Sequence, residues 1–340
     1  MDARRGLRPL LAVATAFPAG VAILSVANVV APQRDGPLAL SQILAPHLVA
    51  ATLLFVPLAL LRGGRALRVA LAVAIVLGVV RFGAGLVSLP GAAPAPDAAT
   101  LRLLAWNLEV GAPDPADVIR VVIAANVDVV AFEELTPDIA DALTADPTLA
   151  GRYPGQAMFP EPGTGGIGIL SRRPLSAAVH RTAPIAAEAD LDLGGATVHV
   201  IAGHPYPAAI RTVSMLRLPI DFDAERRDRD VARFRGWIDP FVAANRPLVV
   251  IGDFNLTDRE PAYGVLAKGL LDAHLEVGQG PGSTWRPDRM KFLPFGVLRI
   301  DYVLTGGGVR AIASGEDCTP RASDHCIVVA TVTVPIDPAA

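Results

Sequence analysis

Cysteine and lysine are nearly absent from this chain of 340 residues, which contains two of each. Two cysteines are too few for a Cys₄ or Cys₃His structural zinc site. Cys318 and Cys326 stand eight residues apart, and two states remain open for them. They are buried thiols in a reducing compartment or a single disulfide in an exported domain. The scarcity of lysine beside many arginines indicates a general preference for arginine rather than a phosphate clamp.

Charge is missing from two long stretches near the N-terminus, residues 9–33 and 36–61. Each is longer than the roughly 20 apolar residues that cross a bilayer, and longer than the core of a signal peptide. A third apolar run, residues 69–90, is interrupted by Arg81, which is costly in a membrane unless it snorkels or pairs. We therefore expect three transmembrane helices within residues 1–90.

Proline and alanine dominate the stretch PGAAPAPDAA that follows, which is typical of a semi-rigid linker. From residue 100 onward, short apolar runs alternate with glycine, proline and aspartate, and no internal repeat is visible. We therefore expect a membrane domain over residues 1–90, a linker over residues 91–99 and a catalytic domain over residues 100–336.

A basic excess is lacking in the part after the membrane segment. Residues 97–340 contain 22 basic and 31 acidic side chains. Proteins that grip nucleic acid by its phosphates usually present a basic face. The composition therefore disfavours a nucleic-acid partner without excluding it.

Short apolar runs separated by turn residues predict many strands and few helices after residue 100. Their mixed order suggests an α+β sandwich, in which two sheets pack face to face. We expect helices over residues 116–125, 137–145 and 223–244, and strands over residues 102–106, 128–132, 166–171, 196–202, 247–252, 299–304 and 326–334.

Polar side chains follow several of these strands at the point where each strand ends. In LVVIGDFNL, Asp253 and Asn255 are two apart, so an extended chain would place them on one face and Phe254 in the core. Such ends would converge if they lie on one side of the sandwich. The other polar residues at strand ends or in adjoining loops are Asn107, Glu109, Glu133, Glu134, His204, Asp301, Asp324 and His325.

Carboxylates, amides and two histidines, with no cysteine cluster, are ligands that suit Mg²⁺ or Mn²⁺ rather than structural zinc. Such a set is typical of sites where water attacks phosphorus. Each residue taken singly has an ordinary explanation, such as a turn acid or a helix cap. Their number and order make coincidence a poor explanation.

The motifs WN, GIGILSR, GH, GDFN, RIDY and SDH occur in an order that resembles the endonuclease/exonuclease/phosphatase superfamily, which is DNase I-like. The resemblance covers residues 101–334, and GDFN with SDH is its most specific part. It implies a four-layer α/β/β/α sandwich. The membrane segment lies outside the family pattern, and its layout resembles actinomycete membrane proteins linked to glycopeptide resistance.

The resemblance implies a Mg²⁺ site, with Mn²⁺ as the alternative ion. Asn107 and Glu109 would flank the metal, Glu134 would be its principal ligand, and Asp324 would complete the acidic side. Glu133 departs from the family, which has glutamine there. An extra acid could raise one pKa of the pair, which leaves open which of the two acids binds the metal.

The same resemblance implies the catalytic groups. His204 would contact the phosphoryl oxygens, Asp253 would orient or deprotonate the attacking water, and Asn255 would hold the phosphate. Asp301 would orient His325, as a carboxylate fixes the tautomer of a histidine.

Three functions are consistent with these residues. The first is a membrane-anchored, metal-dependent hydrolase of a lipid-linked or other small phosphoester. The second is an anchored nuclease, and the third is a non-catalytic relic that only binds phosphate. The acidic balance and the membrane segment favour the first. The apolar stretches 208–220 and 291–298 could line an apolar substrate entry or could be packed loops.

Arginine placement predicts the orientation in the membrane, because short cytoplasmic loops retain basic residues. Residues 1–8 and residues 62–68 each carry three arginines, while Arg34 is balanced by Asp35. Three crossings would then place the catalytic domain outside the cytoplasm. If the third apolar run does not cross, the domain stays inside.

Overall fold

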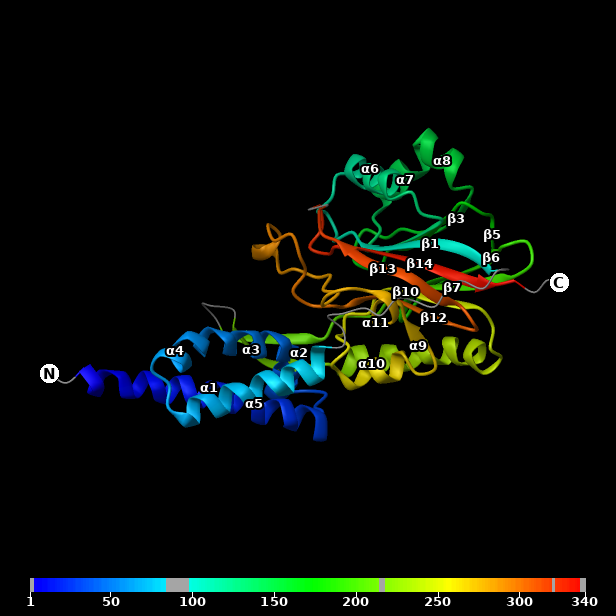
Figure 1. Ribbon diagram of the computed structural model, residues 1–340. Helices are drawn as coiled ribbons and strands as arrows, with labels where there is room; N and C mark the ends of the chain where they lie inside the picture. The colour runs from blue at the N-terminus through cyan, green and yellow to red at the C-terminus, as the bar shows by residue number, and fades with distance from the viewer. Residues whose placement is uncertain (1–2, 84–97, 214–217, 320–321, 337–340) are drawn as a thin grey trace. The chain divides into compact units, whose positions relative to one another are not determined.

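The computed structural model describes residues 3–83, 98–213, 218–319 and 322–336, so most of the expected linker lies outside the described residues. The chain forms two compact units (Figure 1). The helical unit comprises Met1–Val87, Ala209–Glu225 and Arg259–Pro261, and the sandwich unit comprises Ser88–Ala208, Arg226–Asp258 and Ala262–Ala340.

The three expected transmembrane helices are not confirmed. One helix is long and apolar enough to cross a bilayer, over Arg8–Val30, a test that signal sequences also pass. The second apolar run is bent by 69°, and Pro46 and Pro57 each stand in the first turn of a new helix, where the missing N–H is tolerated. The helices are α1 (Ala3–Val30), α2 (Pro37–Ile43), α3 (Ala45–Thr52), η1 (Leu53–Phe55), α4 (Val56–Leu61) and α5 (Arg65–Phe82).

The third run forms α5, which is 18 residues long and contains three arginines. Its charges explain why it fails as an obvious membrane span. Arg81 donates a hydrogen bond to the carbonyl of Ser25 in α1 at 3.3 Å. The guanidinium therefore has a partner within the helical unit.

Two segments from the second half of the chain belong to the helical unit: a β-hairpin and residues 259–261. Gln42 is fully buried and donates to the carbonyl of Arg259 at 2.6 Å. The Asp35 carboxylate accepts from the backbone N–H of Ala224 at 2.7 Å. The hairpin strands are β8 (Ala209–Val213) and β9 (Leu218–Asp223).

The sandwich unit contains two six-stranded sheets, in the orders β13-β14-β1-β2-β4-β3 and β11-β12-β10-β7-β6-β5. The strands of the first sheet are β1 (Ala98–Asn107), β2 (Val129–Glu133), β3 (Gly155–Phe159), β4 (Ile167–Ser171), β13 (Arg310–Asp317) and β14 (Ile327–Pro335). Those of the second are β5 (Leu175–Thr182), β6 (Ile185–Asp192), β7 (Thr197–His204), β10 (Leu248–Asp253), β11 (Leu271–Asp272) and β12 (Asp301–Gly306).

Helices cover the outer face of each sheet, and the mixed two-sheet core confirms the expected class of fold (Figure 1). Apolar side chains of α6, α7 and α8 pack on the first sheet, those of α9 and α10 pack on the second, and a third core lies between the sheets. The helices are α6 (Pro115–Ala125), α7 (Pro137–Ala145), α8 (Pro147–Arg152), α9 (Glu225–Ala243), α10 (Pro261–Leu266), α11 (Ala273–Val277) and η3 (Asp288–Met290).

The row of side chains that faces the opposite sheet becomes polar at one end of the central strands. In β1, Leu103 and Ala105 belong to the core between the sheets, so Asn107, two residues further, points the same way. In β10 the same row ends in Asp253. The pleat therefore delivers several polar groups to one end of the space between the sheets. The others are Glu133 of β2, His204 of β7 and Asp301 of β12.

Candidate active site

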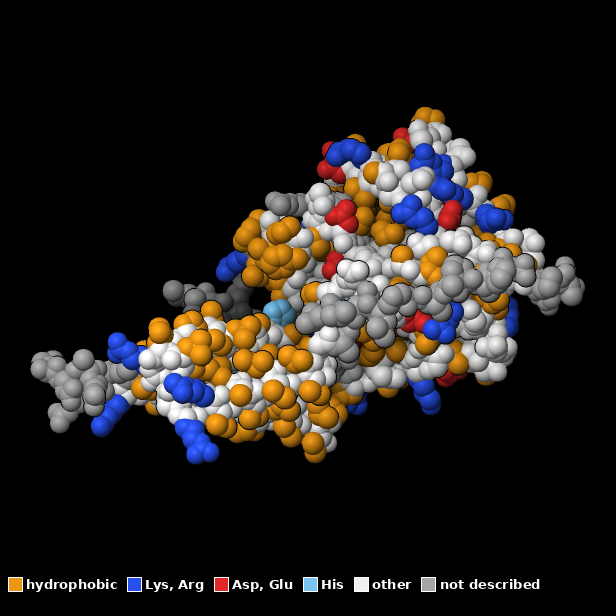
Figure 2. Space-filling view, viewed as in Figure 1, with side chains coloured by type: hydrophobic (Ala, Val, Ile, Leu, Met, Phe, Trp, Pro, Cys, Tyr) orange, Lys and Arg blue, Asp and Glu red, His pale blue; other side chains and the backbone are white. Residues whose placement is uncertain are grey.

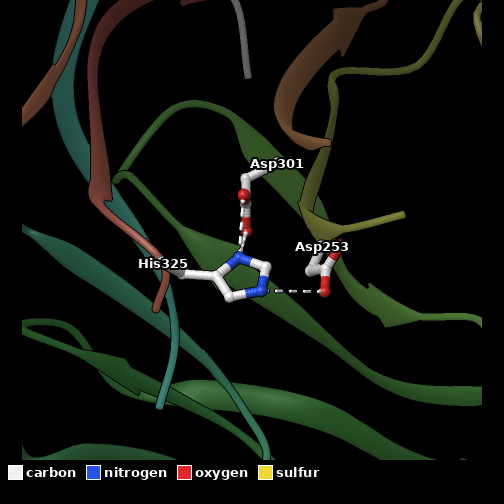
Figure 3. A group of neighbouring side chains, drawn as sticks. All are labelled: Asp253, Asp301 and His325. Atoms are coloured by element: carbon white, nitrogen blue, oxygen red, sulfur yellow. Dashed lines mark hydrogen bonds and ion pairs between the residues drawn. The ribbon is translucent and has the colours of Figure 1, made fainter. Parts of the chain in front are cut away.

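Two carboxylates enclose the ring of His325 (Figure 3). Both oxygens of Asp301 lie 3.0 Å from its Nδ1, and an oxygen of Asp253 lies 3.7 Å from its Nε2. Nε2 of His204 lies 3.6 Å from the same Asp253 oxygen. We call these four residues the inner cluster. None is more than 4% exposed, so their interactions are shielded from water.

Charge pairing decides the protonation of the inner cluster. Burial lowers the pKa of His325, but Asp301 and Asp253 outweigh burial and raise it to about 10. Burial raises the pKa of Asp253, but His325 and His204 outweigh burial and hold it below its usual range. Near neutral pH, His325 is therefore a cation and Asp253 an anion.

His204 stands at the end of β7 with its Nε2 also 3.9 Å from Glu134. Burial lowers its pKa, but the adjacent carboxylate of Asp253 outweighs burial and raises it. Its Nδ1 is buried without a hydrogen-bond partner among the described residues. The Nε2 edge of the His204 ring therefore faces the carboxylates of Asp253 and Glu134.

Two buried hydroxyl groups position this cluster, and sequence reasoning missed both. Thr284 donates a hydrogen bond to the carboxylate of Asp301. Ser323 donates to the backbone carbonyl of Asn107 at 2.7 Å and accepts from the N–H of His325 at 2.9 Å. Ser323 is the first residue of the SDH motif, so that motif was the sequence signal from which its role could have been predicted.

Asn107 joins the ends of the two sheets. Its amide nitrogen donates to Asp253 at 3.0 Å and to Glu134 at 3.3 Å. The other oxygen of Glu134 accepts from the backbone N–H of Val110 at 2.9 Å. Of the four predicted metal ligands, the structure therefore brings Asn107 and Glu134 together beside the inner cluster.

Glu133 and Glu134 occupy different environments. Glu133 continues β2 into the space between the sheets, where both carboxylate oxygens are buried without a partner among the described residues. Burial, then the charges of Asp301 and Asp253, raise its pKa well above the usual range. Gly252 beside this carboxylate has a φ of 133°, and a Cβ there would lie 2.5 Å from the carbonyl oxygen of Gly203, so a glycine is needed. Glu133 is therefore a buried neutral acid.

Three predicted site residues adopt left-handed backbone conformations just after strands end. The φ angles are 55° at Glu109, 56° at Glu134 and 53° at Asn255. Non-glycine residues are uncommon in this region, asparagine less so than glutamate, and such strain concentrates at functional sites. The turns redirect the side chains that follow β1, β2 and β10.

The expected common face of Asp253 and Asn255 is wrong, because β10 ends at Asp253. Phe254 does turn into the core. The amide of Asn255 donates to the carbonyl of Pro205 at 3.0 Å, and its N–H donates to Asp253 at 2.8 Å. Asn255 thus ties together the chain segments after β7 and β10.

A second acidic group, which we call the rim cluster, contains Glu109, Asp288, Asp324 and Lys291. Lys291 Nζ lies 2.6 Å from both oxygens of Glu109 and 3.2 Å from Asp288. The N–H of Asp324 donates to Glu109 at 2.7 Å, and Trp285 Nε1 donates to the Asp324 carboxylate at 2.8 Å. Burial raises the pKa of Asp324 to about 6, with Glu109 adding to the effect.

The donor atoms fit a hard divalent cation. Ligand atoms lie within 4.8 Å of one another in the rim group Glu109–Asp288–Asp324 and in the inner group Asp253–Asp301–His325. In the inner group the protonated His325 offers no lone pair, so a metal there would rely on the neighbouring oxygen ligands. Carboxylate and amide oxygens dominate the two clusters and their neighbours, as Mg²⁺ prefers. Asp288 was not predicted, and Lys291 occupies a cation position within the rim cluster.

Helix α9 braces the loops of the site through buried charged side chains. Arg227, only 2% exposed, donates to the carbonyl of Asn255 at 3.1 Å. Asp230 is also buried and accepts from the N–H of Tyr206 at 3.4 Å. These charges lie inward because backbone groups of two loops need partners there.

A disulfide joins Cys318 and Cys326, which decides between the two states that the sequence left open. The fully buried Arg286 donates to the carbonyls of Cys318 at 3.1 Å and Ser323 at 3.0 Å. The crosslink and this guanidinium together hold the segment that carries Asp324 and His325.

A model of the Endonuclease/Exonuclease/phosphatase family matches residues 104–325. The chain belongs to this family. The family comprises phosphoester hydrolases that generally depend on divalent metals, and the matched residues include those of both clusters. No curated protein sequence matches the chain.

Several solved structures are similar to this chain in fold. TDP2 of D. rerio, complexed with single-strand DNA product, is 18% identical with a TM-score of 0.52, over 69% of this chain and 100% of that one. A family member from Bacteroides vulgatus is 16% identical with a TM-score of 0.51, over 69% and 98%. The human Nocturnin catalytic domain, with bound sulfate, is 17% identical with a TM-score of 0.50, over 71% and 96%.

Proposed function

We propose that this chain is a membrane-anchored, Mg²⁺-dependent hydrolase of phosphoesters, with its sandwich unit outside the cytoplasm and a lipid-linked or other small phosphoester as substrate. The observation that carries the proposal is the buried Asp301–His325–Asp253 arrangement beside His204 (Figure 3). A fixed cation next to a fixed anion, both ready before substrate arrives, suits the attack of water on phosphorus.

Each member of the inner cluster has a distinct part in this reaction. Asp253 is ionised, so its carboxylate accepts the proton of the attacking water. Nε2 of His325 and Nε2 of His204 hold protons that neutralise charge on the phosphoryl oxygens. Asp301 fixes the tautomer of His325 through Nδ1.

Glu134, with Asn107, would hold a metal beside the inner cluster, and Glu109 with Asp324 would hold one at the rim. A bound Mg²⁺ or Mn²⁺ supplies charge neutralisation at the phosphoryl oxygens and lowers the pKa of bound water. Asn255, through Pro205 and Asp253, keeps the loops beside this site in place, and its proposed part is to hold the phosphate there.

Membrane association is supported by the helical unit. Large apolar side chains are exposed along its helices, among them Ile23 at 69%, Leu54 at 79% and Val80 at 75%, and hydrophobic side chains cover much of that unit in Figure 2. Exposed apolar surface on this scale is typical of membrane or protein contact. The disulfide supports an oxidising compartment and hence a location outside the cytoplasm.

Hydrolysis by the full chain in detergent tests the activity. We expect phosphate release from lipid-linked or small phosphoesters with Mg²⁺ and none with EDTA. The same preparation incubated with single- and double-stranded DNA tests the nuclease alternative. Degradation of DNA without release from small phosphoesters would overturn the substrate class, and no hydrolysis of either would favour a phosphate-binding relic.

Fusions after Ala340 test the location. Alkaline phosphatase folds in oxidising compartments and green fluorescent protein fluoresces in the cytoplasm. We expect an active phosphatase fusion and a dark fluorescent one. A bright fluorescent fusion with inactive phosphatase would place the sandwich unit in the cytoplasm, as it would be if α5 does not cross.

A further inference from the structure

A short loop of the sandwich unit exposes aromatic side chains beside the rim cluster. We call residues 286–298, RPDRMKFLPFGVL, the aromatic loop. Phe292 is 64% exposed, Phe295 58% and Met290 39%. Hydrophobic side chains gather in Figure 2 over the orange projecting segment of Figure 1 that contains this loop. Among the described residues from 98 onward, these two phenylalanines are the most exposed large apolar side chains.

The phenylalanines stay exposed because hydrogen bonds from the sandwich unit hold the backbone of the aromatic loop in place. Arg286 is fully buried and donates to the carbonyl of Leu293 at 3.0 Å. The two ends of the loop are closed by Trp285 and Leu298, whose backbones pair at 2.9 Å. A Cβ on Gly296 would lie 2.2 Å from the carbonyl of Ser283, so the return of the loop needs a glycine.

The aromatic loop is continuous with the rim cluster. Its Lys291 bonds Glu109, and Trp285 at its base bonds Asp324. Whatever the phenylalanines contact is therefore brought to the acidic groups proposed to bind metal. Arg289, next to Met290, is exposed. Aromatic and apolar groups with a neighbouring cation match the boundary between lipid phosphates and acyl chains.

We propose that the aromatic loop is a lipid-binding surface, on which Met290, Phe292 and Phe295 enter the outer part of a phospholipid bilayer while Arg289 stays at the level of the phosphates. The inference rests on the membrane association in the proposed function and is independent of hydrolysis. A bilayer suits the loop better than a protein partner, because α1 of the same chain is itself apolar enough to cross one. Docking would present phosphoesters of the membrane surface to the site.

Single labelled cysteines in the full chain test this contact. The native cysteines are paired in the disulfide, so a thiol-reactive NBD fluorophore will label only an introduced cysteine. The test variant is Phe292→Cys. The matched control is Val179→Cys, a 40% exposed position on β5, at the opposite edge of the second sheet from β11 and β12. Both are placed in nanodiscs of equal parts phosphatidylcholine and phosphatidylglycerol.

Spin-labelled acyl chains added to the nanodiscs quench a fluorophore that enters the bilayer. We expect quenching at position 292 to be several-fold stronger than at position 179. Equal quenching at the two positions would overturn the proposal. Emission at 292 that changes only when two chains share a disc, without quenching, would identify a second copy of the chain as the occupant and overturn it as well.

Failure of lipid contact and failure of the proposed function remain distinguishable. If the chain enters nanodiscs and hydrolyses phosphoesters but the label at 292 stays unquenched, only the lipid-binding surface is wrong. If the chain does not enter nanodiscs or sediment with vesicles of the same lipids, membrane association fails and this surface fails with it, whatever the hydrolysis assays give.

Discussion

The inner cluster and the rim cluster contain similar acids in different surroundings. The inner carboxylates of Asp253 and Asp301 are at most 3% exposed and continue the pleat of β10 and β12. In the rim cluster, the Asp288 side chain is 80% exposed and that of Glu109 is 25% exposed; Asp288 begins the short helix η3 and Glu109 lies in the turn after β1. The imidazolium of His325 neutralises charge among the inner carboxylates, whereas the ammonium of Lys291 does so in the rim cluster.

This difference separates groups that are fixed before substrate binds from groups that can rearrange. Strand geometry, the hydrogen bond that Thr284 donates to Asp301 and the one that Ser323 accepts from the N–H of His325 leave the inner cluster little freedom. Lys291 is a long, partly exposed side chain that a metal at Glu109 would displace. We therefore expect substitutions in the inner cluster to affect turnover and those in the rim cluster to affect metal dependence.

The largest effect is expected for Asp253→Asn in the inner cluster. The change keeps the size of the side chain but removes the charge that accepts the proton from water. Turnover should fall by about 10²–10⁴-fold with the fold intact. Hydrolysis rates at saturating Mg²⁺ measure this, with the exposed Asp141→Asn on α7 as control. Normal turnover in Asp253→Asn would remove Asp253 from the reaction.

Glu134→Gln and Glu133→Gln compare how much each of two adjacent acids contributes to metal binding. Glu134 has its carboxylate at the acidic end of the inner cluster, so its loss should raise the Mg²⁺ concentration for half-maximal activity by about 10–100-fold. Glu133 is already neutral, and an amide of the same size should leave that concentration nearly unchanged. Titration with Mg²⁺ measures both, and the reverse order would assign the metal to Glu133.

Removal of the disulfide tests the segment that joins the two clusters. The double change Cys318→Ser and Cys326→Ser opens a link across eight residues, and chain entropy predicts a loss of about 2–3 kcal/mol of stability. Because Asp324 and His325 lie in this segment, turnover and Mg²⁺ dependence should both worsen. Thermal unfolding and Mg²⁺ titration separate the effects. A lower melting temperature with unchanged kinetics would show that Arg286 alone holds the segment.

The smallest effect is expected from pH at the rim. Asp324, which faces Glu109, His325, Trp285 and Lys291, has a pKa raised to about 6. Its carboxylate is charged above that pH and becomes protonated as the pH falls through it, so the Mg²⁺ requirement should rise on acidification. The inner Asp253, with its lowered pKa, stays ionised over this range. Asp324→Asn should abolish the pH dependence of the Mg²⁺ requirement, and a slope that persists in this variant would assign it to another group.

Strand-end residues were predictable because the pleat has a period of two. In β1, β7 and β10, every second residue is apolar and faces the other sheet, and this alternation, visible in the sequence, ends at Asn107, His204 and Asp253. Turns after the strands were not predictable in this way. Asn255 lies in a left-handed turn, so the period that holds in a strand no longer applies to it.

Contacts between distant loops could not be predicted from the sequence either. The partner of Glu109 is Lys291, 182 residues away, and Arg227 of α9 donates a hydrogen bond to the carbonyl of Asn255. Neither pair has a local signal, because each depends on how loops cross after the sheets have packed. The second expected membrane helix is interrupted for a local reason. Pro46 and Pro57 each begin a new helix within a run that hydropathy alone treats as continuous, and the run is bent by 69°.

The order of motifs and the alternation of apolar residues by themselves determined the family, the two-sheet sandwich and the polar ends of its central strands. Only the tertiary structure decided that Cys318 and Cys326 are joined, that Glu133 is buried and neutral while Glu134 reaches the site, and that Lys291 neutralises Glu109. The physical reason is the distance along the chain over which each property is set. The direction of a side chain in a strand follows from its nearest neighbours, but its charge state and its partner depend on groups that only folding brings near.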